Sequence, residues 1–387
     1  MRHVVFIMGL AGVAKSSVWE ILAAGFTILG DKCQTEIVNP RPITSNKLYG
    51  HVGEGTREWK DGLLPRIFRD LALLSKTKKN SKWIVLDGII NAGWIESMST
   101  VMDDNEMLTL ASNERIPLTA SMRLVFEISH LRNSTPATVS RAGIIYINET
   151  DMCWAPYRDK WVLSHDDTKE RDYLDMLFDK YVPTIMDFWK RSMKSVVPMM
   201  DIATIQTICR LLDGLLTEES CPPGGPSELY EMFFVFACIW AFGGNLPSDG
   251  RIDYRTSCSN WWKKEVPFEI KDNGSVFDYF LDETQEFVPW TTIVPELKNS
   301  REMLFSQLSV ETADTIRLTY LMNLYVEHRK PVLFVGTAGT GKTKVMKNKL
   351  ESLDSNEVIY RIVNFSSRTD PKTLQAILES ALDNCCY

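Results

Sequence analysis

Residues 83 to 147 carry the sequence WIVLDGIINAGWIESMSTVMDDNEMLTLASNERIPLTASMRLVFEISHLRNSTPATVSRAGIIYI, which decides the fold class. The stretch contains three apolar runs of strand length: 83–86, 107–111 and 144–147. A polar side chain stands close to each run: Asp87, Asn113 and Arg141. Buried strands of this kind predict an α/β domain with a parallel sheet, and ligands bind at the carboxyl edge of such sheets. We therefore expect the three polar side chains to face one bound ligand.

That ligand is predicted by a phosphate-binding loop at the start of the chain. The apolar run Val4–Met8 leads into GLAGVAKS at residues 9–16, one residue away from the pattern GxxxxGK[ST]. In that pattern backbone N–H groups at a helix N-terminus cradle phosphates, while the lysine contacts the terminal phosphates and the hydroxyl ligates Mg²⁺. The residues expected to do so here are Gly9, Gly12, Lys15 and Ser16. A buried strand before an ordinary helix is the alternative.

Ala14 is the departure from the pattern, because it stands where glycine is expected. A Cβ there costs roughly 1 kcal/mol or more if the backbone needs a positive φ, and it crowds the approach of the phosphates. Asp87, at the end of a strand beside the loop, is expected to hold Mg²⁺ through water. Hydrolysis usually needs a second carboxylate to orient the attacking water, and none of the next four residues, Gly-Ile-Ile-Asn, is acidic.

Asn113 and Arg141 are candidate catalytic residues. The amide of Asn113 could hydrogen-bond a γ-phosphate or its water, although asparagine after a strand is more often a turn residue. Arg141 lies on a predicted loop, where a guanidinium suits an arginine finger that reaches the phosphates of a neighbouring module.

A second phosphate loop, GTAGTGKT at residues 336–343, matches the complete pattern and follows the apolar run Pro331–Val335. The residues expected to take phosphate are Gly336, Gly339, Gly341, Lys342 and Thr343, and Thr343 is also expected to ligate Mg²⁺. One further strand is predicted at Val358–Val363, and no later strand ends in an acid. We expect the chain to stop inside this domain, before its metal-binding carboxylate.

The chain between the two loops is predicted to be helical. Helical spacing of apolar residues extends over 173–189, 202–216 and 228–242. The predicted organisation is an α/β subdomain at 1–150, a helical lid at 151–246, a connector with a short hairpin at 247–310, and the start of a second module at 311–387.

Composition sets the broad class. The chain has 387 residues, 44% of them hydrophobic and 24% charged, which is typical of globular domains. A net charge of −7 argues against a nucleic acid or an anionic membrane as partner, because both usually require a basic face. No apolar run approaches the roughly 20 residues that cross a bilayer. The eight cysteines show no metal-ligand spacing and are expected to be reduced thiols.

Several longer stretches closely resemble dynein heavy chains, in particular the axonemal outer-arm type. They are TREWKDGL (56–63), WIESMSTVMDDNEMLTLASNERIPL (94–118), MRLVFEISHLRNSTPATVSRAGIIYIN (122–148), VFACIWAFGG (235–244) and VFDYF (276–280). The resemblance extends over nearly the whole chain. It implies AAA+ modules of a motor ring, with residues 1 to about 246 as the second module and those from about 311 as the start of the third.

The resemblance also implies roles for individual residues. It matches Lys15 and Ser16 to the first phosphate loop, Asp87 to the Walker B aspartate and Asn113 to the sensor. Arg141 matches a finger-like arginine that acts on nucleotide held by the first module, while Lys342 and Thr343 match the loop of the third. In the family the second module is regarded as binding nucleotide with little hydrolysis. This chain departs from the family at two further positions where acids are expected: Ile89 and Asn91.

The implied cofactors are ATP and Mg²⁺. The implied partners are the neighbouring AAA+ modules and, through other parts of a heavy chain, dynein intermediate and light chains and microtubules. The implied location is the cytoplasm and cytoskeleton, in the axoneme of a cilium or flagellum.

Two hypotheses about the function stay open: a nucleotide-responsive coupling segment of a motor ATPase, and a non-catalytic scaffold with a degenerate site. A free-standing P-loop kinase or GTPase fits poorly, because nothing resembles a base-specificity motif or an acceptor site.

Overall fold

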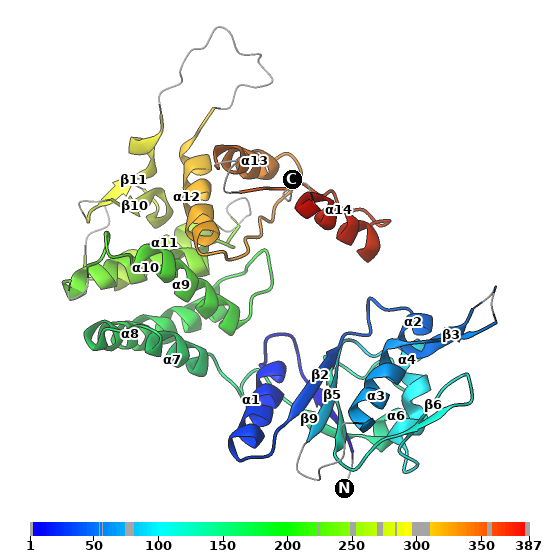
Figure 1. The fold of residues 1–387 in the computed structure, drawn as a ribbon. Helices are drawn as coiled ribbons and strands as arrows, with labels where there is room; N and C mark the ends of the chain where they lie inside the picture. The colour runs from blue at the N-terminus through cyan, green and yellow to red at the C-terminus, as the bar shows by residue number, and fades with distance from the viewer. Residues whose placement is uncertain are drawn as a thin grey trace. The chain divides into compact units, whose positions relative to one another are not determined.

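The computed structural model describes residues 3–53, 55, 57–73, 81–222, 225–247, 253–268, 274–282, 285–295, 310–353 and 358–383. The chain divides into two compact units, Met1–Cys153 and Trp154–Tyr387, which are described one at a time (Figure 1). In the described part of the chain, no helix has the length and apolar character needed to span a membrane.

The first unit is built on a five-stranded sheet in which every neighbouring pair is parallel. Across the sheet the strands are β2 (Gln34–Val38), β5 (Lys82–Asp87), β8 (Met122–Ile128), β1 (Val4–Met8) and β9 (Gly143–Tyr146). The three inner strands are almost continuous apolar runs, which is typical of parallel strands that are buried on both faces. The predicted α/β fold with a parallel sheet is confirmed.

Helices and hairpins cover the sheet. Helix α1 (Lys15–Ile28) follows β1, and the indole of its Trp19 is buried. In Figure 1, α1 and α3 lie on opposite faces of the sheet. The remaining helical elements are α2 (Ser45–Tyr49), α3 (Leu63–Leu73), α4 (Ala92–Ile95), the 3₁₀ turn η1 (Glu96–Met98), α5 (Ser99–Met102) and α6 (Pro136–Arg141). Phe68 of α3 packs in the same core as Phe6 and Phe126 from the sheet.

Two antiparallel hairpins stand apart from the main sheet: β3 (Gly50–Val52) with β4 (Trp59–Asp61), and β6 (Met107–Thr109) with β7 (Arg115–Pro117). The strand expected at 107–111 is therefore a hairpin strand, and its predicted place in the parallel sheet is wrong. That place belongs to β8, which the sequence analysis did not single out as a strand. The seven-residue β8 buries all but one of its side chains, whereas β6 is only three residues long.

The second unit begins with a helical core. Its helices are α7 (Ala155–Leu163), α8 (Thr168–Ser192), α9 (Asp201–Leu215), α10 (Ser227–Gly243) and α11 (Tyr254–Glu265). Aromatic side chains tie them together, for example Phe178 of α8 against Phe234 of α10, whose ring centroids are 4.9 Å apart. Edge-to-face pairs of this kind stabilise the core beyond what the burial of the rings alone contributes. The predicted all-helical lid is confirmed as a fold.

The segment predicted as a connector packs into the same core. After α11 it forms a 3₁₀ turn η2 (Val276–Asp278), a hairpin of β10 (Tyr279–Leu281) and β11 (Phe287–Pro289), and a turn η3 (Trp290–Ile293). Trp262, Phe277 and Trp290 are almost fully buried among the helices, and the Trp290 indole donates to the Phe277 carbonyl at 3.1 Å.

The end of the chain contains α12 (Ala313–Glu327), α13 (Lys342–Ser352) and α14 (Pro371–Asp383). The strands predicted at 331–335 and 358–363 do not form, so those two predictions are wrong. Leu333 is 83% exposed, and Ile359 and Ile362 are also exposed. A parallel strand exists only through hydrogen bonds to a neighbouring strand, and no described strand pairs with either segment.

Candidate nucleotide sites

The first phosphate loop connects β1 to α1 and has two residues with positive φ. Gly12 has φ 83°, and Ala14, the N-cap of α1, has φ 60° and ψ 29°. Left-handed backbone is unstrained for glycine and costs a residue with a Cβ about 1–2 kcal/mol. Ala14 thus adopts the conformation that the glycine of the pattern normally supplies, and the loop keeps its shape at an energetic cost. The first-turn N–H groups of α1 lack helical partners and are free to bind an anion.

Lys15 and Asp87 lie close enough to interact electrostatically. The Lys15 ammonium donates to the carbonyl of Leu10 in the same loop, at 2.6 Å. Burial raises the pKa of the Asp87 carboxyl, the nearby Glu127 carboxylate raises it further, and the positive charge of Lys15 lowers it. The loop lysine therefore acts electrostatically on the aspartate at the end of β5, and the roles of both residues at a nucleotide stay predictions.

Glu127 belongs to this site, although the sequence analysis missed it. The residue is only 8% exposed, and its carboxylate accepts hydrogen bonds from the Ser16 hydroxyl at 2.8 and 3.0 Å and from the Trp19 indole at 3.2 Å. Glu127 on β8 lies directly opposite Asp87 on β5. The available signal was a single acid near the end of the apolar run MRLVFEI, where a buried charge is unusual unless it has a partner.

Asn113 does not join these residues in the way that was predicted. It is an exposed residue in the turn between β6 and β7, with φ 65°, and its N–H donates to the Leu110 carbonyl at 3.0 Å. The hairpin is separate from the parallel sheet that carries Asp87. Asparagine tolerates left-handed backbone well, so Asn113 serves as a turn residue. Its predicted position at the carboxyl edge of the sheet is wrong.

Arg141 is the last residue of α6, and one residue, Ala142, separates it from the edge strand β9. The helix is capped at its other end, because the Thr138 N–H donates to the Thr135 hydroxyl at 3.3 Å. The Arg141 guanidinium is about one-third exposed and pairs with the Asp103 carboxylate at the end of α5. Arg141 is thus on a helix terminus and not on a loop, and its action on the nucleotide of a neighbouring module stays a prediction.

The second phosphate loop has the same backbone conformation, with glycine at both left-handed positions. Gly339 has φ 83° and Gly341, the N-cap of α13, has φ 81°. The Lys342 ammonium donates to the Gly336 carbonyl at 2.8 Å, to the Thr337 carbonyl and to the Thr340 hydroxyl. Thr343 follows in the first turn of α13 and is exposed.

A cavity of about 460 Å³ borders the second loop. Gly341 and Val345 form part of its wall, and Ile316, Tyr320 and Asn323 of α12 contribute apolar surface and one amide. Small-molecule pockets typically measure 300–1,000 Å³ and combine apolar walls with a few polar groups. The cavity therefore has the size and character that suit the base and sugar of a nucleotide whose phosphates lie on the loop.

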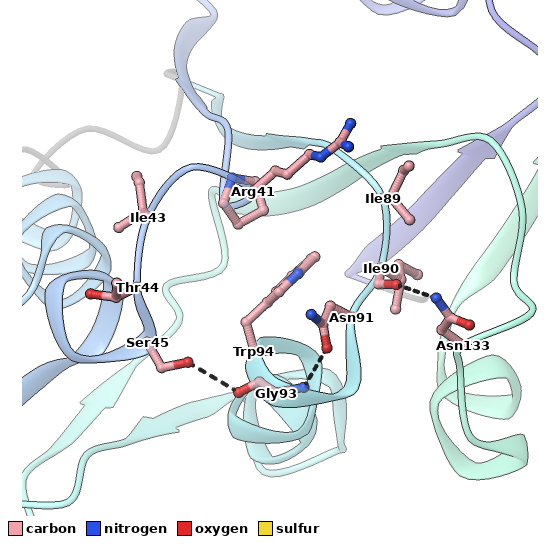
Figure 2. Close-up of a pocket in the computed structure, with 11 residues that line it drawn as sticks. Arg41, Ile43, Thr44, Ser45, Ile89, Ile90, Asn91, Gly93, Trp94 and Asn133 are labelled. Carbon is pink, nitrogen blue, oxygen red and sulfur yellow. Dashed lines mark hydrogen bonds between the residues drawn. The ribbon is translucent and has the colours of Figure 1, made fainter. Parts of the chain in front are cut away.

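Another cavity, of about 380 Å³, lies in the first unit, and Figure 2 shows it in close-up. Loops that follow β2, β5 and β8 line it, and they include Ile89 and Asn91, the positions where the resemblance leads one to expect acids. The Asn91 side chain accepts a hydrogen bond from the Gly93 N–H at 3.0 Å and so supports the start of α4. These two residues therefore shape a pocket wall and a helix start.

The first loop has oxygen atoms nearby that could bind a metal ion. The Ser16 hydroxyl lies beside the carboxylate of Glu127, with Asp87 on the adjoining strand. In the described residues there is no group of three or more His, Cys, Asp or Glu side chains that forms a metal site without other ligands. Mg²⁺ usually binds through one or two carboxylates together with substrate phosphates. The donor set of the first loop fits that mode.

The phosphate loop after β1, an acid at the end of β5 and a helical unit define a P-loop domain of the AAA type with a lid. Comparisons with family models agree. An AAA domain of the dynein-related subfamily matches residues 4–142, the dynein heavy chain AAA lid domain matches residues 174–292, and the P-loop containing dynein motor region matches residues 297–385. The chain belongs to the dynein heavy chain family.

Individual relatives support the same conclusion. Dynein axonemal heavy chain 17 of Mus musculus is 47% identical over 99% of this chain and 8% of its own length. Dynein axonemal heavy chain 9 of Homo sapiens is 45% identical over 99% of this chain and 8% of its own length. The dynein beta chain of the flagellar outer arm of Chlamydomonas reinhardtii is 43% identical over 99% of this chain and 8% of its own length. The chain thus spans less than a tenth of the relatives that it matches.

Proposed function

We propose that this chain is a nucleotide-responsive segment of an axonemal dynein motor ATPase, with residues 1–246 as the second module of the ring and the residues from about 311 as the start of the third. The observation that carries the proposal is the first loop, whose Ser16 hydroxyl donates to Glu127, the residue opposite Asp87 in the sheet, and whose Lys15 charge acts on Asp87. Lys15 would contact the terminal phosphates of ATP, and Ser16 and Asp87 would hold Mg²⁺. The ion would neutralise phosphate charge.

The first site binds nucleotide and hydrolyses it little. Efficient hydrolysis requires a group that orients the attacking water. The positions after Asp87 offer Ile89, which is apolar, and Asn91, which is engaged with the Gly93 N–H. Ala14 further weakens binding because its Cβ lies on the loop in a strained conformation. The role of this module is therefore to report nucleotide occupancy to its neighbours.

Arg141 is proposed to act on nucleotide held by a preceding module. Its position supports this role, because a partly exposed guanidinium at a helix terminus reaches outward once the pair with Asp103 opens. Exposed ion pairs contribute only about 0–1 kcal/mol, so the Asp103 pair is a weak restraint. Neighbouring AAA+ modules are the direct partners. Intermediate chains, light chains and microtubules would be reached through other parts of a heavy chain, in an axoneme.

A non-catalytic scaffold is the second candidate function. The observation that favours it is the positive φ of Ala14, which marks the first loop as degenerate. In that case the module would transmit force through the ring without bound nucleotide.

Calorimetric titration with Mg·ATP tests the proposal. The full chain carrying Lys342→Ala is used, so that only the first loop binds, and phosphate release is measured on the same sample. We expect weak binding and turnover below about 0.1 per second, a hundredth of a typical enzyme rate of about 10 per second. Ala14→Gly in the same background is the companion variant, and it should bind more tightly.

Turnover at a typical enzyme rate would contradict the proposed lack of hydrolysis. If neither variant binds nucleotide, the scaffold function holds in place of the proposal.

A further inference from the structure

Glu127 is a buried carboxylate without a cationic partner in the part of the chain that the structure describes. Its three hydrogen bonds come from the Ser16 hydroxyl, which approaches both oxygens, and from the Trp19 indole. No lysine, arginine or histidine of the described residues forms an ion pair with it. A buried carboxylate that only neutral donors satisfy is costly, and it is usually retained where a cation binds.

The distances around Ser16 match the coordination sphere of Mg²⁺. Oxygen ligands lie 2.0–2.1 Å from Mg²⁺ in a nearly ideal octahedron, so two adjacent ligands are about 2.9 Å apart. The Ser16 hydroxyl and the two oxygens of Glu127 are separated by 2.8 and 3.0 Å. A metal ion bound to Ser16 would therefore find a Glu127 oxygen already at the distance of a neighbouring ligand.

The second carboxylate lies on the adjoining strand. Asp87 and Glu127 are directly opposite in the β5–β8 register, and neighbouring strands run about 4.8 Å apart. Residues paired in this register lie on the same face of the sheet, so the two negative charges are neighbours. A divalent cation between them would remove their mutual repulsion.

We propose that Glu127 is a metal-coordinating residue of the first nucleotide site, so that Mg²⁺ is held by Ser16 and by two carboxylates, Asp87 and Glu127. This inference rests on the proposed nucleotide site. When the metal is absent, Glu127 keeps the Ser16 hydroxyl in place. When the metal binds, the charge of Glu127 makes nucleotide binding at this loop unusually dependent on the divalent ion.

The test compares the dependence of nucleotide binding on the metal. Full-length chains carrying Lys342→Ala, with and without Glu127→Gln, are titrated with a fluorescent ATP analogue at increasing Mg²⁺ and also in EDTA. Glutamine can still accept from Ser16 and Trp19 but lacks the charge. We expect Glu127→Gln to raise the Mg²⁺ concentration for half-maximal binding at least tenfold. In EDTA it should bind nucleotide as well as the parent or better, because one negative charge near the phosphates is gone.

A control variant separates local coordination from general charge. Glu20→Gln removes one exposed carboxylate from α1, the helix that carries Ser16, and should leave the Mg²⁺ dependence unchanged. Mn²⁺ binding, followed by its electron paramagnetic resonance signal in the presence of ADP, gives a second readout. It should weaken in Glu127→Gln and not in Glu20→Gln. Thermal melting of all variants checks that they fold.

The outcomes separate the two levels of the argument. If the parent with Lys342→Ala binds no nucleotide in Mg²⁺ or EDTA, the proposed function fails. If the parent binds and Glu127→Gln shows the same Mg²⁺ dependence, only the coordinating role of Glu127 is wrong. An equal loss of affinity in Mg²⁺ and in EDTA would also overturn it, because that result indicates a purely structural role.

Discussion

The two phosphate loops have nearly the same backbone in very different surroundings. Both have a left-handed glycine in the middle of the loop, with φ 83°, and a left-handed N-cap residue before the lysine. In both, the lysine ammonium donates to a carbonyl of its own loop. The first loop follows β1, which lies in the buried sheet. The second follows residues 331–335, which no described strand pairs.

This difference shows that the conformation of a phosphate loop does not depend on the strands around it. The conformation of the loop is local, because it depends on left-handed residues and on the start of a helix. The proposed metal coordination is not local, because Asp87 and Glu127 lie on strands that are far from the loop in the sequence. The first loop has an imperfect motif in a complete sheet, and the second has a perfect motif without one. On this proposal, metal binding depends more on the sheet around a loop than on the loop motif.

The largest expected effect tests the surroundings of the two loops. Phe6 of β1 is fully buried, so Phe6→Ala should lower the free energy of unfolding of the first unit by about 3–5 kcal/mol. Leu333, which precedes the second loop at a similar distance, is 83% exposed, so Leu333→Ala should change stability by no more than about 0.5 kcal/mol. Hydrogen exchange in urea, resolved by peptide, reads each unit separately.

Leu333→Ala is the matched control, because it removes an apolar side chain from the corresponding segment. A loss of more than about 2 kcal/mol in that variant, within the range for buried leucines, would mean that residues 331–335 are packed in solution. The contrast between the two loops would then disappear.

The intermediate effect concerns the lysines. Hydrogen bonds to charged groups contribute about 1.5–3 kcal/mol, so Lys15→Ala and Lys342→Ala should each weaken nucleotide binding at their own loop about 10- to 150-fold. Equilibrium dialysis with a labelled nucleotide should show one site lost in each variant. The site that remains in Lys342→Ala should depend more strongly on Mg²⁺, because its loop adjoins Asp87 and Glu127. Equal Mg²⁺ dependence in the two variants would contradict this comparison.

Local patterns in the sequence predicted local structure well. Val4–Met8 forms β1 with those bounds, and the long helices of the second unit coincide with the segments of helical spacing. The expected strain at Ala14 is confirmed by its positive φ. These features depend only on residues that are close in the sequence, so they can be predicted from the local sequence pattern.

Features that depend on distant partners were predicted poorly. The run at 107–111 and the run in β8 are both apolar, and nothing local says that one joins a hairpin and the other the centre of a sheet. Residues 331–335 have the pattern of a strand but no described partner. Likewise, the contact between Glu127 and Ser16 joins residues 111 positions apart, so it becomes visible only when β8 lies beside β1.

The smallest expected effect concerns the N-cap of each loop. Ala14→Gly removes the cost of left-handed backbone, about 1–2 kcal/mol, but it also gives the unfolded chain more freedom, worth about 0.4–1 kcal/mol. The free energy of unfolding of the first unit should therefore rise by between zero and about 1.6 kcal/mol, measured by urea denaturation. Gly341→Ala makes the reverse change, and we expect it to weaken nucleotide binding at the second loop with little loss of stability, because that loop is exposed and can relax. If Ala14→Gly stabilised the chain without improving nucleotide binding, the weakness of the first site would have to come from its carboxylates and not from its strained loop.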